Sequence, residues 1–217
     1  YQGQKFMYYT GWTQARATPF SFFIGLAMSA DGGKTYKRYS RAPILGRSFH
    51  DPFLTCSPFV MIENGIWRMW YVSGTGWEGS YQLHSRPDMP AKMKHFYHIK
   101  YAESQNGIEW KNDGKICIDY RPEEYAIARP ILLKEDGIYK MWYCYRGGSN
   151  TYRGGYAESP DGTHWERQDH NIGIDVSPTG WDSEMICYPC AFEHEEKKYL
   201  IYNGNDYGRT GIGLAVN

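Results

Sequence analysis

The chain lacks a surplus of charge of either sign, a long apolar run and an even set of cysteines. Its 24 Lys and Arg residues balance 24 Asp and Glu residues, so the sequence predicts no nucleic-acid partner and no attraction to an anionic membrane. No apolar run approaches the roughly 18 residues that a membrane-spanning helix needs, and no signal peptide opens the chain. We therefore expect a cytoplasmic protein, unless residues upstream of Tyr1 carry a leader. The sequence leaves its oligomeric state open.

The five cysteines argue against a disulfide framework, because such a framework pairs an even number of them. Cys187 and Cys190 have the C-x-x-C spacing of zinc and redox sites. No second pair completes a zinc site, and no strand–helix pattern supports a redox motif. The sequence thus predicts reduced core thiols, no metal and no cofactor, with zinc or redox chemistry as the alternative.

Helical periodicity is also missing over any useful length, whereas aromatic residues are abundant. They make up 17% of the chain, with 20 Tyr and 8 Trp. Runs of aromatic and β-branched residues bounded by Gly, Asn and Asp predict strands, and therefore an all-β fold. Flat rings on a polar scaffold suit either sheet packing or sugar binding, because the C–H faces of sugars are apolar.

Two interleaved repeats organise the chain. The first is a turn in which Ser is followed by Asp or Asn, then by Gly and an aromatic residue; it occurs at 29–36, 104–110 and 159–165. The second is a hairpin whose second strand is aromatic; these strands lie at 68–71, 140–143 and 198–202. Asn64-Gly65 and Asp136-Gly137 tolerate the positive φ of a type I′ hairpin turn, while the third copy has lost its Gly. The Asp or Asn of the first repeat is predicted to bond local backbone, which is a structural role.

Repeats of this kind predict β-propeller blades of four antiparallel strands. Each repeat unit is predicted to begin with an inner strand that starts at a proline. These prolines are Pro58, Pro130 and Pro189. About four partial or complete blades are visible in a single domain over residues 1–217. The first blade lacks its inner strand and the last stops before its final turn, so we expect a fragment of a longer chain, with unusual pairing of the ends as the alternative. The insertion 74–98 is interpreted as a surface patch or lid, with a metal pair at His95 and His98 as the alternative.

The pattern resembles the five-bladed propeller glycosidases of glycoside hydrolase families 43, 32, 62 and 68, with the related family 130 phosphorylases. The resemblance rests on the aromatic hairpins and on the second and third turns described above. It is strongest to uncharacterised propeller proteins of bacterial surface-polysaccharide gene clusters, through the segments 8–12, 180–185 and 202–208. It implies a five-bladed β-propeller. The acidic segment that this group carries upstream of the position of Tyr8 is not in this sequence.

In such propellers the starts of the inner strands face the substrate funnel, so the resemblance directs attention to the residues before each proline. Asp51 and Asp182 each lie seven residues before a proline, and Glu184 lies five residues before Pro189. Glu184 has aromatic neighbours that would raise the pKa of a general acid. Asp51 is the candidate base or pKa-setting carboxylate, and Asp182 is the third catalytic candidate.

The substrate-binding candidates lie in the same segments. Arg129, directly before Pro130, could bind a carboxylate or phosphate through its bidentate fork. The other candidates are aromatic or polar residues beside the inner strands: Trp181, Tyr188, His50 and Ser57. Ser57 occupies a place where family 43 enzymes usually carry Asp.

Each candidate also has a structural interpretation. Asp51 and Asp182 could cap a turn or pair with an arginine, and Arg129 could form an ion pair between blades. Glu123 and Glu124 are expected in a solvated loop.

The sequence favours a glycoside hydrolase-like enzyme that acts on a bacterial polysaccharide or its precursor by carboxylate acid/base catalysis. A non-catalytic carbohydrate-binding propeller is the alternative. A phosphorylase would need further basic residues near Arg129, for which Arg146 and Arg153, expected in a loop, are candidates. A sialidase-like enzyme is less favoured, because only the turn at 29–36 fits the Asp-box, with Tyr36 in the final place.

Overall fold

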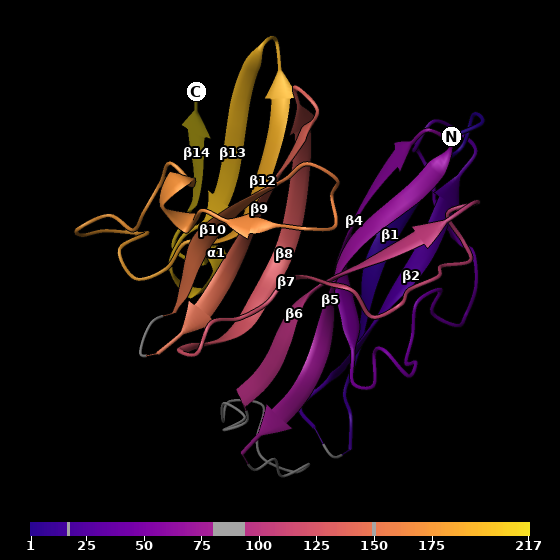
Figure 1. Ribbon diagram of the computed structural model, residues 1–217, viewed down its shortest axis with the longest axis horizontal. Coiled ribbons are helices and arrows are strands. Elements are labelled where there is room, and N and C mark those ends of the chain that lie inside the picture. The colour runs from indigo at the N-terminus through magenta and orange to yellow at the C-terminus, as the bar shows by residue number, and fades with distance from the viewer. Residues whose placement is uncertain (17, 80–93, 149–150) are drawn as a thin grey trace. The chain divides into compact units, whose positions relative to one another are not determined.

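The computed structural model describes residues 1–16, 18–79, 94–148 and 151–217 (Figure 1). Antiparallel strands dominate these residues, and helical structure within them is limited to a 3₁₀ turn, η1 (Asp169–Asn171), and one short helix, α1 (Asn205–Gly208). The all-β prediction is confirmed. The chain divides into two compact units, an N-terminal unit (Tyr1–Lys115) and a C-terminal unit (Ile116–Asn217).

No helix in the described ranges has the length and apolar character needed to cross a membrane.

The N-terminal unit contains two antiparallel sheets. One has the order β1-β2-β3, formed by β1 (Lys5–Thr13), β2 (Ser21–Ser29) and β3 (Lys37–Arg38). The other joins β4 (Thr55–Glu63), β5 (Ile66–Glu78) and β6 (Lys94–Ser104). β4 packs against β1 and β2, and the core between the sheets contains Ile24, Leu45, Met69, Tyr71 and Ala102. Fully burying one such large side chain stabilises the fold by about 1.5–3 kcal/mol.

The C-terminal unit begins with the short strand β7 (Ile116–Ile118) and repeats the same plan. One set of strands has the order β8-β9-β10-β11, formed by β8 (Glu124–Glu135), β9 (Ile138–Gly147), β10 (Tyr152–Ser159) and β11 (Glu166–Arg167). The next sheet contains β12 (Cys187–His194), β13 (Lys197–Asn203) and β14 (Ile212–Val216) (Figure 1). β12 packs against β8 and β9.

The inner strands begin earlier than the sequence suggests. Pro58, Pro130 and Pro189 lie inside β4, β8 and β12 rather than at their first residues. Each proline was expected at the first residue of its strand, because proline has no backbone N–H to donate to a neighbouring strand. Each proline here instead lies within an irregularity of its strand, where a ladder hydrogen bond is already missing.

The segment interpreted as an insertion is partly regular strand. Residues 74–78 and 94–98 extend β5 and β6 as a long hairpin arm, and the ring of His95 stacks on Tyr97 (ring centroids 5.1 Å apart). The lid hypothesis concerns residues 80–93, which lie outside the described residues.

The repeated Ser-Asp/Asn-Gly turns form one hydrogen-bonded structure three times. In each, the Ser hydroxyl donates to the Asp or Asn side chain and accepts a backbone N–H of a following Gly, at 2.8–2.9 Å. Asp161 also accepts the backbone N–H groups of Thr163 and His164, at 2.7 and 2.8 Å. The side chains thus satisfy backbone donors that would otherwise be unpaired, and the predicted structural role is confirmed.

The two hairpin turns that contain Gly have left-handed backbone, as predicted, and the third turn has it as well. Asn64-Gly65 has φ of 50° and 80°, and Asp136-Gly137 has φ of 50° and 82°. The third turn places Glu195 and Glu196 at φ of 48° and 61°. Because a side chain with a Cβ is disfavoured in this region, the third turn stores strain that the other two avoid at their second position.

We expect Glu196→Gly to raise the free energy of unfolding by about 0.5–1 kcal/mol, since the relief of left-handed strain exceeds the entropic cost of Gly. Thermal unfolding of the two proteins checks this, and the midpoint should rise by roughly 2–4 °C per kcal/mol for a chain of this size. Gly137→Ala, at the equivalent place in the second hairpin, should lower the midpoint. An unchanged or lower midpoint for Glu196→Gly would contradict the assignment of strain.

Candidate functional site

The residue directly before each inner-strand proline has the same unusual backbone. Ser57, Arg129 and Tyr188 have φ of 49°, 60° and 53°. Each lies where the pairing register shifts, between residues 56 and 59, 128 and 131, and 187 and 190. These are β-bulges, which bend a strand and redirect a side chain, and they are frequent next to functional sites. Left-handed backbone at residues as large as Arg and Tyr costs of order 1–3 kcal/mol each.

In the N-terminal unit, the Asp51 carboxylate is completely buried. It accepts hydrogen bonds from the Tyr71 hydroxyl (3.0 Å), the Ser73 hydroxyl (2.6 Å) and the Asn112 amide (3.0 Å). The Lys100 ammonium lies 3.5 Å away and also donates to the His50 carbonyl. Asp51 is 0% exposed, so its surroundings match those of a structural ion pair. Ser57 is half-buried, and its backbone N–H donates to the Thr10 hydroxyl at 3.0 Å.

In the C-terminal unit, one asparagine holds the loop that carries three of the candidates. The buried Asn205 side chain accepts the N–H groups of Glu184 (2.7 Å) and Met185 (3.0 Å) and donates to the Gly180 carbonyl (3.1 Å). The Thr210 hydroxyl donates to the Trp181 carbonyl at 2.7 Å. The backbone of the loop 180–185 is therefore held by hydrogen bonds near both of its ends.

The side chains of this loop differ in exposure. Asp182 is 5% exposed and accepts the Tyr202 hydroxyl at 3.2 Å. Burial and the nearby Asp182 raise the pKa of Tyr202, so the phenol remains a donor. The Trp181 ring stacks on Tyr202 at 5.7 Å between centroids and still has 37% of its surface exposed. Glu184 is exposed, so it is the only one of the three carboxylate candidates that is open to solvent in the described ranges.

The bulges at Arg129 and Tyr188 meet at one buried thiol. Cys144, on β9, donates to the Ala128 carbonyl (3.5 Å) and accepts the backbone N–H of Tyr188. Burial raises the pKa of Cys144 to about 12, which keeps the thiol protonated and able to donate. The thiol thus joins the bulge of β8 to the bulge of β12. Cys187 is also buried and unpaired by disulfide, in agreement with reduced core thiols.

An aromatic cluster with a guanidinium surrounds Tyr188. Its ring stacks on Tyr207 (5.9 Å, 28°) and lies 5.8 Å from Tyr152. The Arg146 guanidinium lies over the Tyr152 ring at 4.3 Å and donates to the Tyr207 hydroxyl at 2.5 Å. Arg146 is on β9, not in a loop as expected from the sequence, because the aromatic strand continues to Gly147.

Arg153, on β10, connects this cluster to the loop of Glu184. Its guanidinium donates to the carbonyls of Glu184 (2.8 Å) and Tyr152 (3.1 Å). The Thr151 hydroxyl donates to the same Glu184 carbonyl. Glu184, Tyr188 and the start of β10 are consequently neighbours. The expected loop position of Arg153 was wrong, since β10 begins at Tyr152.

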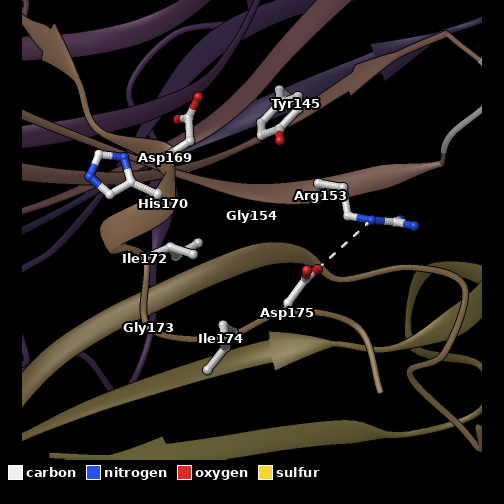
Figure 2. Close-up of a pocket in the computed structure, with 9 residues that line it drawn as sticks. All are labelled: Tyr145, Arg153, Gly154, Asp169, His170, Ile172, Gly173, Ile174 and Asp175. Carbon is white, nitrogen blue, oxygen red and sulfur yellow. Dashed lines mark ion pairs between the residues drawn. The ribbon is translucent and has the colours of Figure 1, made fainter. Parts of the chain in front are cut away.

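A pocket of about 600 Å³ opens beside Arg153 (Figure 2). Its lining combines polar and apolar side chains with glycine backbone: Tyr145, Arg153, Gly154, Asp169, His170, Ile172, Gly173, Ile174 and Asp175. Figure 2 shows the Asp175 carboxylate directed at Arg153, with 4.0 Å between Oδ1 and Nε. A Cβ on Gly154 would lie 2.2 Å from Ile172, so Gly is needed for Ile172 to pack there. The volume lies in the range of small-molecule sites, about 300–1,000 Å³.

The carboxylate of Asp169 belongs to a network that sequence reasoning missed. It accepts the Tyr143 hydroxyl (2.5 Å) and lies 2.8 Å from Arg167, which forms two bonds with Glu124 at 2.7 and 2.9 Å. Glu124 was expected in a solvated loop, but it is in β8 and its side chain is 7% exposed. Its partner is 43 positions away in the sequence, so no local signal could have identified the pair.

The structure thus brings together the candidates of the C-terminal unit: Arg129 and Tyr188 through Cys144, and Trp181, Asp182 and Glu184 through Asn205. Asp51, His50 and Ser57 are in the other unit, so the convergence of all candidates in one funnel stays a prediction. Within the described part of the chain, no group of three or more His, Cys, Asp or Glu side chains is placed to hold a metal ion.

Sequence comparison finds two relatives from strains of Mycobacterium tuberculosis, "Uncharacterized protein MT1551" and "Uncharacterized protein Rv1502". Each is 39% identical to this chain over 214 residues, which cover 98% of the chain and 67% of the relative. The chain belongs to their family. No family model matches it.

The similar solved structures are propeller glycoside hydrolases. A BT0996–RGII complex matches 100% of the chain over 63% of its own length, with a TM-score of 0.75 and 18% identity. A "thermostable family-43 glycoside hydrolase" matches 100% of the chain over 68% of its own length, with a TM-score of 0.70 and 18% identity. A GH32 β-fructofuranosidase from Bombyx mori matches 99% of the chain over 45% of its own length, with a TM-score of 0.65 and 15% identity.

These matches confirm a β-propeller fold of the glycoside hydrolase type. The number of blades and the extent of the domain stay predictions. The chain spans 63% of the length of the first of these structures.

Proposed function

We propose that the protein is a glycoside-processing enzyme of the hydrolase type, which acts on a bacterial polysaccharide or its precursor. The observation that carries the proposal is the loop 180–185, whose backbone Asn205 holds at Glu184 and which carries both the exposed Glu184 and the partly exposed ring of Trp181. Glycosidic bond cleavage requires a carboxylic acid that protonates the leaving oxygen, and an aromatic face can bind the apolar side of the sugar. The fold of the propeller glycoside hydrolases supports it by analogy.

In this proposal Glu184 donates a proton to the glycosidic oxygen as the bond to the leaving sugar breaks. The Trp181 ring offers an apolar face to the C–H groups of a sugar. Asp182, buried against Tyr202, holds the loop rather than contacting substrate. A second carboxylate must activate water or stabilise the positive sugar ring, and the pocket contains one exposed carboxylate, Asp175.

Asp51 has a structural role in this proposal, because its carboxylate is fully buried and cannot contact a substrate. The same burial favours the alternative of a carbohydrate-binding propeller, in which the aromatic residues remain and the acid/base pair does not operate. The two functions differ in whether bound glycan is cleaved.

The test is to measure release of reducing sugar and equilibrium binding side by side, on the full-length protein, with a panel of aryl glycosides and bacterial polysaccharides. Turnover in phosphate-free buffer supports a hydrolase. Turnover only with added inorganic phosphate, giving a sugar phosphate, would replace it by a phosphorylase. Binding of polysaccharide without release of sugar would refute the enzyme and support the binding alternative.

A further inference from the structure

Arg129 is an exposed cation in a costly backbone conformation. Its φ of 60° places a long side chain in the left-handed region, directly before a proline and inside a bulge. In the described part of the chain, no hydrogen bond or ion pair joins its guanidinium to another residue. Intramolecular bonding of the side chain therefore does not explain why the strain is kept, and such strain is concentrated at ligand-binding positions.

A second arginine lies on the neighbouring strand. Arg146 of β9 pairs with Ala126 of β8, and Cys144 of β9 pairs with Ala128, the residue before Arg129. Arg146 is held by the Tyr207 hydroxyl and the Tyr152 ring, so its position is defined. The positive charge of the two arginines is thus concentrated near the bulge of β8, where this strand pairs with β9.

An aromatic surface adjoins this positive charge. Tyr188 occupies the bulge of β12 that Cys144 joins to the bulge of Arg129, and its ring stacks on Tyr207. A ring face can cover the apolar side of a sugar while a guanidinium fork donates to two oxygens of a carboxylate or phosphate.

We infer that Arg129 is a specificity-determining residue, which binds the carboxylate or phosphate of an acidic sugar whose ring packs against the tyrosine cluster. This inference rests on the proposed function for its substrate class, because it names the kind of glycan that the same region accepts. The guanidinium of Arg129 donates two hydrogen bonds to the anionic group, and the positive charge of Arg146 strengthens the attraction. The ring of Tyr188 provides the apolar contact with the sugar. Neutral sugars would leave the Arg129 fork unpaired.

The experiment measures binding by NMR titration at low ionic strength, with D-glucuronate and glucose 6-phosphate as acidic probes and D-glucose as the neutral probe. We expect one acidic probe to bind about tenfold more tightly than glucose, from one charge-assisted bidentate contact. Preference for glucuronate identifies a carboxylate, and preference for glucose 6-phosphate identifies a phosphate. Equal affinity for all three probes, or no binding of either acidic probe at millimolar concentration, would overturn the inference.

Variants separate the fork from general charge. Arg129→Gln should abolish the preference and Arg129→Lys should retain only part of it, since Lys keeps the charge and loses the bidentate geometry. Arg38→Gln, at an exposed arginine of β3, should retain the preference in full. Retention of the preference by a folded Arg129→Gln protein would exclude Arg129 as the anion-binding residue.

The outcomes distinguish this inference from the proposed function. Preferential binding of an acidic sugar without turnover of any glycan would refute the enzyme and leave the inference standing. Turnover of neutral glycosides with no acidic preference would do the opposite.

Discussion

Replacement of Glu184 by Gln is expected to lower kcat on a cleaved glycan by a factor of about 10² to 10⁴, the usual contribution of a general acid. An amide has nearly the shape of the carboxylic acid, but it cannot deliver a proton to the leaving oxygen. The N–H of residue 184 would still donate to Asn205, so the loop should keep its position. Turnover and glycan binding, measured on the same preparations, check the prediction.

Binding should change little in this variant, because the loss affects the transition state more than the bound substrate. Glu193→Gln is the matched control, since Glu193 is an exposed glutamate on β12 with no assigned role. Aryl glycosides with good leaving groups should be affected least, because their departure needs little proton donation. Wild-type turnover in a folded Glu184→Gln protein would remove Glu184 as the acid.

Replacement of Asp51 by Asn is expected to lower the free energy of unfolding by about 3–5 kcal/mol, the usual result of breaking a buried ion pair from one side. The Lys100 ammonium, whose side chain is 9% exposed, would lose the carboxylate 3.5 Å away. The Tyr71 and Ser73 hydroxyls would also lose an ionised acceptor. Urea denaturation with an unchanged slope measures the difference.

A second change tests whether the loss comes from the unpaired charge. Lys100→Met in the Asp51→Asn background should recover part of the stability, because the remaining buried ammonium is removed. Glu109→Gln, at an exposed glutamate, should leave the unfolding midpoint near that of the wild type. An Asp51→Asn protein of normal stability that has lost turnover would instead place Asp51 among the reacting groups.

Short-range patterns were sufficient for much of the fold. The Ser-Asp/Asn-Gly turns and the Asn64-Gly65 and Asp136-Gly137 hairpins form as predicted, because their hydrogen bonds and φ values depend on neighbours within a few residues. The sequence also identified the segments before the inner prolines as places of interest. It did not predict the bulges there, since a bulge depends on how two strands align.

The candidate site was harder to read from the sequence. Asp51 and Asp182 each lie seven residues before a proline. Both are buried, and each accepts a hydrogen bond from a tyrosine hydroxyl. Glu184, two residues further along than Asp182, is exposed. Spacing along the chain carries no information on burial, and burial determines whether a carboxylate can meet a substrate.

The amino-acid sequence alone was enough to establish the strand-rich repeat and the turn chemistry, because each repeat satisfies its own backbone groups locally. Only the folded structure shows which residues that are distant in the sequence form hydrogen bonds and ion pairs with one another. Asn205 locks the loop of Glu184 from 21 residues away, and Glu124 pairs with Arg167 across 43 residues. Such contacts form when strands distant in sequence pack into one sheet or neighbouring sheets, so a linear pattern cannot specify which polar groups will meet.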